Sequence, residues 1–489
     1  MKKKIFIITS VFLLILIYIF MYNSANKWDS LRTLKSYFPQ EVRTFVKKYF
    51  FFPKYQKSLE DKINELLISE KEKIAKGEYV AAIKEKKILD LVESYGYINF
   101  KKTNFEKKLN LNSGSINVQS FSNKVISVPK YVGKGTGYLG FNDDNIFVVS
   151  ANGLISYFNI TDLNQTSFNA KIIKSNIRDL IKYDRFFMTS QYGIKDVMIL
   201  NNKIYISYLK QKDPSPNTGK WKNHCYSTSI ISADLNYEFL KFDEFFSPEM
   251  CIKEEDERYI EYLAHQSGGR ISKYKNDKLL FTIGDFRTYA VSQQKENLFG
   301  KIISMDLNGK NSKIVSMGHR NPQGLFFDEE NNIIFSTEHG PDGGDEVNYN
   351  NNLDDNKIEN YGWAISSYGD HHYKFNDKQL DALFPLYKSH KDYGFEEPLT
   401  YFYPSIGISQ IIKIPENNYH NLLVASMGSK IEEGDLSLHY LKVDKNFNIL
   451  DQKILPLGQR IRDMIFIRKH KMVLMFFDTT SSIGYFKLN

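Results

Sequence analysis

The feature of the sequence that most constrains its fold is an aliphatic or aromatic run that recurs along most of the chain. Each run follows a polar turn and ends in a small or polar residue. The runs are NIFVVSANG at 145, KIYISYL at 203, KLLFTIGD at 278, NIIFSTEHG at 332, NLLVASMG at 421 and KMVLMFFD at 471. Their unequal spacing is typical of repeated sheets that carry loops of different lengths.

Six such units predict an all-β fold, a six-bladed β-propeller over residues 113–489. A single four-stranded blade cannot cover its own faces, whereas blades stacked around an axis cover one another. A pair of β-sandwiches would give a similar strand-rich sequence. The propeller is favoured because the unusual polar residues lie next to runs of different units, as they would around one central mouth.

The N-terminus predicts a membrane anchor. Lys2, Lys3 and Lys4 precede an uninterrupted run of low polarity, IFIITSVFLLILIYIFMY, which is long enough to span a bilayer. The lysines place the N-terminus in the cytoplasm and the rest of the chain outside, as a single-pass protein of the inner membrane with its main domain in the periplasm. A cleaved signal peptide is the alternative, and it predicts the same exported location. We assign the anchor to residues 1–25.

Residues 26–112 are expected to form a helical stalk or linker. Within them, 57–96 place apolar residues at helical spacing among alternating charges, with Gly77 as a break. The charges indicate a solvated face.

The charge of the chain argues against nucleic-acid binding. Its formal net charge of +8 arises from 65 basic and 57 acidic residues that are spread along the sequence. A nucleic-acid-binding protein typically concentrates its basic residues in one stripe.

Cys225 and Cys251 are the two cysteines of the chain. In an oxidising compartment an even pair predicts a disulfide rather than a metal site or a nucleophile. Two unpaired structural thiols are the alternative.

Several polar motifs follow one another in a fixed order. They are HQSGGR at 265–270, GHRNPQG at 318–324, EHGPDGGDE at 338–346, NYGW at 360–363, YPSIGIS at 403–409 and GQRIRDM at 458–464. Together they resemble the glucose/sorbosone dehydrogenase family of six-bladed quinoprotein propellers, over roughly residues 120–489. The resemblance implies oxidation of an aldose or related sugar by hydride transfer to pyrroloquinoline quinone, a tricarboxylate cofactor held with Ca²⁺.

The resemblance also implies roles for individual residues. His265 is expected to be the base that takes the hydroxyl proton of the sugar, and Arg320 to stabilise negative charge on the quinone. The other expected cofactor-binding residues are Gln266, Asn321, Gln323, Ser405, Lys430, Arg460 and Arg462. The alternative for His265 is a structural histidine in a turn. The alternative for the arginine motif is a salt-bridged turn between blades.

Calcium is expected to bind the loop EHGPDGGDE. Ca²⁺ accepts backbone carbonyls, which Gly340 and Pro341 can present. The resemblance assigns a second, structural calcium to Asp345, Glu346 and Tyr361. An acidic surface turn is the plain alternative.

Arg460 and Arg462 alternate along a strand-like segment, so both side chains are expected on one side of it. They can meet the carboxylates of the cofactor, or pair with Asp463 or other acids of the chain. The resemblance places Tyr403 and Trp363 at the substrate mouth.

Three positions depart from the pattern of the family. Ala264 stands where soluble glucose dehydrogenases carry an acid, and Lys430 is displaced from the position of the cofactor lysine. The early motif that contributes a glutamine is hardly recognisable in GIKDVMILNNKIYIS at 193–207.

The leading hypothesis is therefore an anchored periplasmic sugar dehydrogenase with an unknown electron acceptor. A propeller that binds a ligand or partner without turnover is the alternative. A lactonase-type hydrolase has no obvious ligand set in the sequence.

The anchor gives the first prediction. Full-length chain expressed with its N-terminus intact should sediment with membranes and resist extraction by high salt, because residues 1–25 span the bilayer. Immunoblotting of membrane and periplasmic fractions measures this. Periplasmic protein that lacks residues 1–25 would contradict the anchor but not export.

Overall fold

The computed structural model describes residues 78–111, 114–123, 126, 136–213, 224–254, 262–275, 277–355, 357–371, 383–415 and 419–488. The chain divides into two units, Met1–Ala75 and Lys76–Asn489, and the described residues belong to the second. The predicted anchor at 1–25 and the stalk up to residue 77 lie outside the described residues. Among the helices of the described part, none is both long and apolar enough to cross a bilayer.

The described strands form hydrogen-bonded sheets with mostly antiparallel pairing. One sheet contains β7 (Ile194–Leu200), β8 (Lys203–Gln211), β9 (Cys225–Asp234), β11 (Asp243–Phe246) and β12 (Ile252–Lys253). The next contains β13 (Gly268–Tyr274), β14 (Lys278–Ile283), β15 (Lys301–Asp306), β16 (Lys313–Met317) and β20 (Glu359–Asn360).

Two further sheets have four strands each. One contains β17 (Pro322–Asp328), β18 (Ile333–Glu338), β19 (Asp345–Asn350) and β21 (Thr400–Phe402). The other contains β22 (Ile408–Ile414), β23 (His420–Ser426), β24 (Ser437–Val443) and β25 (Ile449–Pro456).

The largest sheet joins strands from both ends of the described region. Its members are β26 (Ile461–Ile467), β27 (Met472–Phe477), β28 (Ser482–Lys487), β2 (Gly114–Ser122), β1 (Tyr97–Leu111), β6 (Ser167–Ser175), β5 (Ile155–Asn159), β4 (Asn145–Ser150) and β3 (Gly137–Asn142), with β10 (Phe239–Leu240) beside β6. The antiparallel pairing of β2 with β28 ties the early strands to the C-terminal ones.

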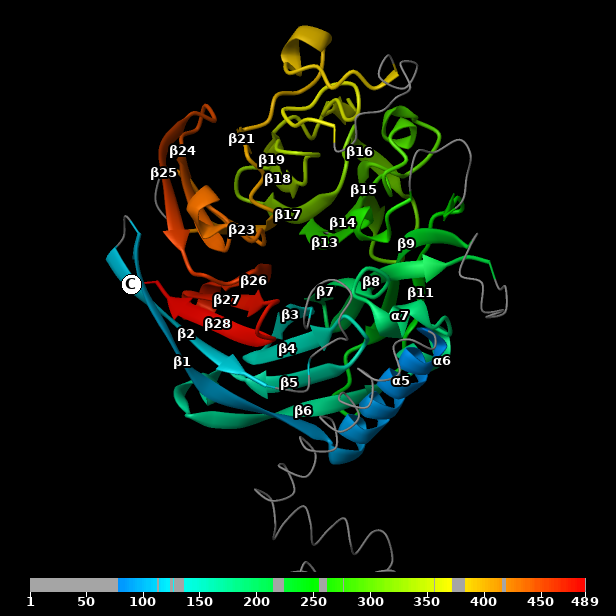
Figure 1. Ribbon diagram of the computed structural model, residues 1–489, viewed down its shortest axis with the longest axis vertical. Coiled ribbons are helices and arrows are strands. Elements are labelled where there is room, and N and C mark those ends of the chain that lie inside the picture. The colour runs from blue at the N-terminus through cyan, green and yellow to red at the C-terminus, as the bar shows by residue number, and fades with distance from the viewer. Residues whose placement is uncertain are drawn as a thin grey trace, which may run out of the picture. The chain divides into compact units, whose positions relative to one another are not determined.

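The sheets surround a common centre (Figure 1). The strands β3, β7, β13, β17, β22 and β26 contact one another in sequence, and β26 contacts β3, so they close a ring. We call them the inner strands. The all-β arrangement is therefore propeller-like.

The recurring apolar runs of the sequence are the strands next to the inner ones, namely β4, β8, β14, β18, β23 and β27. These strands are buried on both faces. In β14, Leu280 packs in the cluster shared with β17 and β18, and Phe281 in the cluster shared with β8 and β9. In β23, Leu422 and Leu423 likewise belong to different clusters. A strand covered on both sides requires apolar residues at consecutive positions, which explains the runs.

The predicted boundary between stalk and sheet at residue 113 is wrong. The helical part is confirmed for α5 (Glu78–Tyr95), but Tyr97–Leu111 is the strand β1, which pairs with β2 and β6. Gly96, at φ +77°, separates the two elements. The sequence does not indicate this strand, because its charged middle is exposed. Ile98 and Phe100, near its start, are buried.

Helix α5 packs against α7 (Arg185–Met188), β1 and β6. Lys86 forms an ion pair with Asp184 at 2.9 Å, and the amide of Asn152 donates to Glu85 at 2.7 Å. Arg178, in α6 (Ile177–Leu180), pairs with Glu93. This part of the predicted stalk is therefore docked on the sheets.

The remaining described helices are short 3-10 turns in the loops. They are η3 (Ile160–Asn164), η4 (Ala264–Gln266), η5 (Ala290–Gln293), η6 (Lys391–Tyr393), η7 (Ile431–Glu433) and η8 (Arg468–His470).

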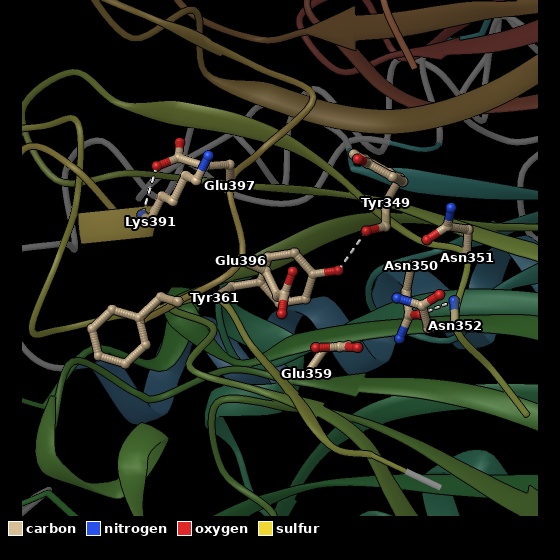
Figure 2. Close-up of a pocket in the computed structure, with 10 residues that line it drawn as sticks. Tyr349, Asn350, Asn351, Asn352, Glu359, Tyr361, Lys391, Glu396 and Glu397 are labelled. Carbon is tan, nitrogen blue, oxygen red and sulfur yellow. Dashed lines mark hydrogen bonds between the residues drawn. The ribbon is translucent and has the colours of Figure 1, made fainter. Parts of the chain in front are cut away.

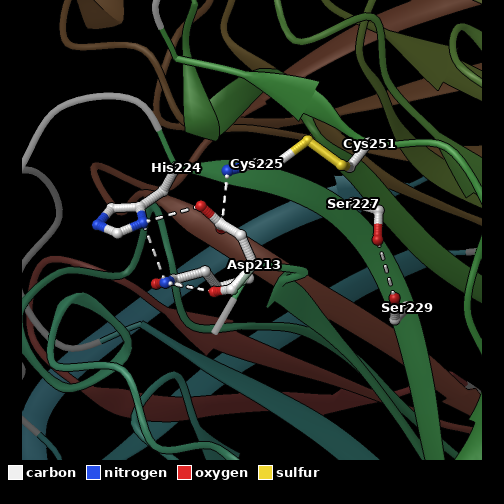
Figure 3. The surroundings of a disulfide bond; sticks show 7 residues. Asp213, His224, Cys225, Ser227, Ser229 and Cys251 are labelled. Atoms are coloured by element: carbon white, nitrogen blue, oxygen red, sulfur yellow. Dashed lines mark hydrogen bonds and ion pairs between the residues drawn. A yellow bond between two sulfur atoms is a disulfide. The ribbon is translucent and has the colours of Figure 1, made fainter. Parts of the chain in front are cut away.

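The predicted disulfide is confirmed: Cys225 and Cys251 are bridged. The antiparallel pairing of β9 with β12 brings the two residues together, with Ile252 opposite Tyr226. Figure 3 shows the bond, and the amide N–H of Cys225 donates to Asp213 at 3.0 Å beside it. The bridge closes a loop across a sequence separation of 26 residues.

Removal of this bridge gives the second prediction. The double substitution Cys225→Ser with Cys251→Ser should lower the free energy of unfolding by about 3 kcal/mol, because the unfolded chain regains the entropy of the open loop. Urea unfolding of the variant beside oxidised and reduced wild type measures the change. Equal midpoints for the variant and oxidised wild type would contradict it.

Candidate active site

The motif residues gather at one end of the inner strands. Because β14 and β18 run antiparallel to β13 and β17, the end of each lies beside the start of its inner neighbour: Gly268 is opposite Ile283, and Pro322 is opposite Glu338. We call this end the mouth. The same arrangement holds for β22 with β23 and for β26 with β27. Residues within three positions of these strand ends include His265, Asp285, Arg320, His339, Gly340, Ser405, Met427, Arg460 and Asp478.

Directly inside the mouth, Arg270 of β13 connects four inner strands. Its guanidinium pairs with Asp196 of β7 at 3.0 Å and with Asp463 of β26 at 2.6 Å. It also donates to the carbonyls of Gln323, at 2.6 Å, and Arg462, at 2.7 Å. Burial opposes the charge of Arg270, but Asp463 and Asp196 outweigh it and raise the pKa of the guanidinium.

His265 lies in η4, immediately before β13. Its side chain is accessible to solvent but sits among the surrounding loops and several cations. Desolvation by these loops, with the charges of Arg320 and Lys195, lowers the pKa of His265 to about 3. The neighbouring cations alone would also lower this pKa, because they disfavour protonation of the imidazole whether or not the ring is exposed. The imidazole is therefore neutral near pH 7.

Arg320 is held by a network of buried groups. Its Nη1 donates to the carbonyl of His339 at 3.1 Å, and its guanidinium lies over the ring of Trp363, 5.3 Å from the centroid. With its amide oriented to satisfy its neighbours, Gln266 accepts from Arg320 Nη2 at 2.9 Å and donates to Asp285 at 3.2 Å. Asp285 also accepts the indole N–H of Trp363 at 2.7 Å. Arg320 is thereby fixed in orientation.

Burial acts in opposite directions on the acid and the base of this network. It raises the pKa of Asp285 to about 6, with the charge of Arg320 opposing that change. Burial lowers the pKa of Arg320, and the negative charge of Asp285 opposes that change. At pH 7 the two groups form a charged pair around Gln266.

Asn321 and Gln323 tie β17 to β13. The side-chain carbonyl of Asn321 accepts from the amide N–H of Gly268 at 3.2 Å and from the side chain of Gln323 at 3.0 Å. Their contact with a cofactor stays a prediction.

The predicted calcium loop is organised around the buried carboxylate of Asp345. It accepts from the amide N–H of Gly340 at 3.0 Å and from Ser405 Oγ at 3.0 Å, and His339 lies 3.7 Å away. Burial would raise the pKa of Asp345, but the hydrogen bond and charge of His339 outweigh burial and lower it. Pro341 follows in the same loop and is buried. The carboxylate of Asp345 thus shapes the loop from within.

Tyr403 covers the same loop from outside. Its side chain is exposed, with 61% of the residue's surface accessible, and its hydroxyl donates to Asp370 at 2.8 Å. A Cβ on Gly343, which has φ +81°, would lie 2.2 Å from the Tyr403 ring. Only glycine permits this approach.

Glu346 and Tyr361 have protein partners. Glu346 forms an ion pair with His390 at 3.2 Å, and the hydroxyl of Tyr361 donates to the carbonyl of Tyr349 at 2.6 Å. Burial raises the pKa of Glu346, while His390 opposes that change. The second calcium stays a prediction for these residues and Asp345.

Tyr361 also lines an acidic pocket of about 300 Å³ (Figure 2). Glu359 and Glu396 lie in this pocket, and the ammonium of Lys357 reaches them at 2.6 and 2.9 Å. One lysine of the chain thus pairs with both acids and offsets one of their two negative charges.

Five of the predicted residues line one small cavity of about 10 Å³: Arg320, Gly340, Glu346, Tyr361 and Trp363. These residues come from motifs separated in the sequence. The structure therefore brings the arginine motif and the calcium loop to one place.

Arg460 and Arg462 lie on one side of their strand, since both approach Asp478. Arg462 Nη2 lies 3.3 Å from Asp478 Oδ2, and Arg460 Nε lies 3.7 Å from it. Arg460 also donates to the carbonyl of Met427. Two guanidinium groups thus share one carboxylate, and Asp463, the neighbour considered from the sequence, pairs with Arg270 instead.

Lys430 forms an ion pair with a neighbouring acid and does not share Asp478 with Arg460 and Arg462. Its side chain is 59% exposed and its ammonium bonds Glu433 at 2.8 Å. The hydrogen bond and charge of Glu433 raise the pKa of Lys430.

Sequence reasoning missed Asp285, Asp478 and Lys195. The first two end the recurring runs KLLFTIGD and KMVLMFFD, and this position at the end of a strand could have indicated them. No pattern marked Lys195, the second residue of β7. Across the described residues, no group of three or more His, Cys, Asp or Glu side chains is arranged to hold a metal ion.

A family model for glucose/sorbosone dehydrogenases matches residues 160–481. The chain belongs to the glucose/sorbosone dehydrogenase family. The matched region contains His265, the arginine motif, the calcium loop and both arginines of the last motif.

Individual relatives are more distant. The aldose sugar dehydrogenase YliI of Escherichia coli is 26% identical over 213 residues, which cover 40% of this chain and 53% of the relative. An uncharacterized protein of Synechocystis is 27% identical over 222 residues, covering 40% and 50%. The chain thus spans about half the length of these relatives. Quinoprotein glucose dehydrogenase B of Acinetobacter calcoaceticus is 38% identical over 89 residues, covering 18% and 17%.

The fold of this family member agrees with solved structures. The soluble aldose sugar dehydrogenase of Escherichia coli, in its apo form, superposes with a TM-score of 0.54 at 19% identity, covering 76% of this chain and all of the other. A glucose dehydrogenase superposes with a TM-score of 0.53 at 19% identity, covering 72% and 95%.

Arg270 gives the third prediction. Arg270→Met should lower the free energy of unfolding by about 3–5 kcal/mol, because it leaves Asp196 and Asp463 buried without their cation. Arg468→Met is the matched control: its ion pair with Glu330 is exposed, so we expect a change of about 1 kcal/mol or less. Urea unfolding compares the two variants. Equal losses would contradict the central role of Arg270.

Proposed function

We propose that the protein is a quinoprotein sugar dehydrogenase that oxidises an aldose or related sugar with pyrroloquinoline quinone and Ca²⁺. The observation that carries the proposal is the placement of a neutral His265 beside the buried, oriented Arg320 in a mouth rich in cations. Membership of the family and the name of the Acinetobacter relative, a quinoprotein, support the same activity.

We assign the fold as a six-bladed propeller. The proposed blades begin with the inner strands β3, β7, β13, β17, β22 and β26. The last blade takes its outer strand from β2, which supports closure by residues from both ends of the domain.

The residues of the mouth fit an anionic cofactor. Arg460 and Arg462 share the single carboxylate of Asp478, so positive charge exceeds negative charge there. The Nε of Arg462 is buried and has no hydrogen-bond partner among the described residues. A tricarboxylate would be held by these two arginines and Arg320, and Ca²⁺ by the carbonyls of Gly340 and Pro341.

When bound, the quinone supplies the acceptor for the hydride of the sugar. The residues of the chain prepare the substrate. His265 is neutral and accepts the proton of the sugar hydroxyl as the adjacent C–H bond breaks. Arg320 keeps its proton and contributes fixed positive charge, and Gln266 with Asp285 holds it in place. No acid at position 264 orients the imidazole, because the residue there is Ala264.

The disulfide supports an exported location. Bridged cysteines persist in oxidising compartments, so Cys225 and Cys251 accord with a periplasmic domain behind an inner-membrane anchor at 1–25. The partners in this proposal are a sugar, an electron acceptor and the membrane, and no nucleic acid.

The fourth prediction separates chemistry from binding. His265→Gln should leave quinone binding nearly intact and lower the rate of dye-linked aldose oxidation about 10²–10⁴-fold, the usual contribution of a positioned base. Absorbance titration with pyrroloquinoline quinone and Ca²⁺ measures binding, and steady-state assay over a panel of aldoses measures the rate.

His470→Gln is the matched control. His470 lies in η8, after the opposite end of β26, and pairs with Asp144, so its substitution should change neither quantity. A rate of His265→Gln within a few-fold of wild type would refute the base. If wild type binds no quinone at any Ca²⁺ concentration, a non-catalytic propeller that binds a ligand or partner becomes the better account.

A further inference from the structure

Lys195 is a buried lysine at the mouth that the motifs of the sequence do not explain. Lys195 is the second residue of the inner strand β7 and packs against β13. A Cβ added to Gly269 of β13 would lie 2.3 Å from the Cβ of Lys195. Its ammonium donates to the carbonyls of Ser190, at 3.1 Å, and Gln191, at 2.5 Å. An ammonium has three N–H groups, so these two bonds leave one for a ligand.

The charge of Lys195 has no carboxylate partner among the described residues. Its neighbour Asp196 is occupied by Arg270 and by the amide N–H of Ile271. Burial, followed by the positive charge of Arg462, lowers the pKa of Lys195 to about 7. The charge of Lys195 in turn lowers the pKa of His265, so Lys195 interacts electrostatically with both the proposed base and the last motif.

Lys301 shows what a purely structural buried lysine looks like in this fold. Its ammonium donates to three carbonyls, those of Val291, Ser292 and Phe299, at 3.0, 2.9 and 2.7 Å. All three of its N–H groups are thereby used inside the protein. Lys195 differs in the remaining N–H group and in its position among the mouth residues.

Lys430, in contrast, is already neutralised. It pairs with Glu433, and its amide N–H donates to Asp435 at 2.7 Å. The charges that act on its ammonium are those of Glu433, Glu432 and Asp435, and no cation of the mouth is among them. Its ammonium is therefore poorly placed to meet an anion in the mouth.

We propose that Lys195, rather than Lys430, provides the ammonium that binds a carboxylate of the quinone cofactor. The proposal rests on the proposed function. The carboxylate accepts the third N–H of Lys195 and compensates a buried charge that the chain leaves uncompensated. Lys195 of β7 would then join Arg460 and Arg462, at the start of β26, in a set of cations around the mouth.

The test compares Lys195→Met with Lys430→Met in the full chain. Absorbance titration with pyrroloquinoline quinone in excess Ca²⁺ measures the affinity of each variant. Lys195→Met should weaken binding about 10- to 100-fold, as expected for loss of one charge-assisted hydrogen bond, and Lys430→Met should change it less than about two-fold. Thermal unfolding without quinone checks that each variant is folded.

A second measurement uses wild-type protein and does not depend on the folding of a variant. Reductive methylation followed by peptide mass spectrometry reports the reactivity of each lysine. Quinone with Ca²⁺ should slow methylation of Lys195 several-fold and leave Lys430 unchanged. Ca²⁺ alone is the control and should protect neither lysine.

The outcomes are distinguishable. Wild type that binds quinone while Lys195→Met binds equally well, or while Lys195 stays unprotected, overturns the assignment of Lys195 and leaves the proposed function standing. If only Lys430→Met loses quinone binding, Lys430 is the cofactor lysine, as expected from the family. Wild type that binds no quinone overturns the proposed function, and the assignment of Lys195 with it.

Discussion

The site depends on one buried guanidinium. Arg270 joins β13 to β7, β17 and β26, which are distant in sequence, through two carboxylates and two backbone carbonyls. Burial of these charges is costly, and only their mutual pairing offsets the cost. Lys195 and Arg462 directly precede Asp196 and Asp463, at irregularities in the pairing of β7 and β26, so holding the two carboxylates at the centre also constrains the backbone that carries these cations. One interaction thus sets the positions of the cations at the mouth.

Much of the fold could be predicted because its most buried strands are contiguous in the sequence. Each recurring apolar run is a strand covered on both faces, as Leu280 and Phe281 show, so consecutive positions in it are apolar. Strand β1 shows where this signal ends. It joins the large sheet, but its middle residues, from Lys101 to Lys108, are mostly exposed and charged, so they resembled the helical pattern before them. Pairing partners, not composition, make it a strand.

The site was predictable where its residues are neighbours in sequence, and not where they meet only in space. His265 with Gln266 belongs to one short motif that could be recognised. The acid that supports this motif, Asp285, comes from the end of the next strand, and Asp478 reaches the two arginines in the same way. Lys195 gave no signal at all, because a lysine at the start of a strand usually points to solvent. Only the ring of inner strands shows that this position faces other cations.

In the proposed function, the charges at the mouth link anion binding to base chemistry. Desolvation, followed by the charges of Arg320 and Lys195, lowers the pKa of His265 to about 3 and so keeps the imidazole neutral. A base with so low a pKa accepts a proton weakly. An anion bound among the same cations offsets their charge, and this raises the pKa of His265 toward the range in which it accepts a proton effectively. In the proposed function, the cations that would bind the cofactor therefore keep His265 unprotonated until an anion is in place, and binding of that anion would make His265 a stronger base.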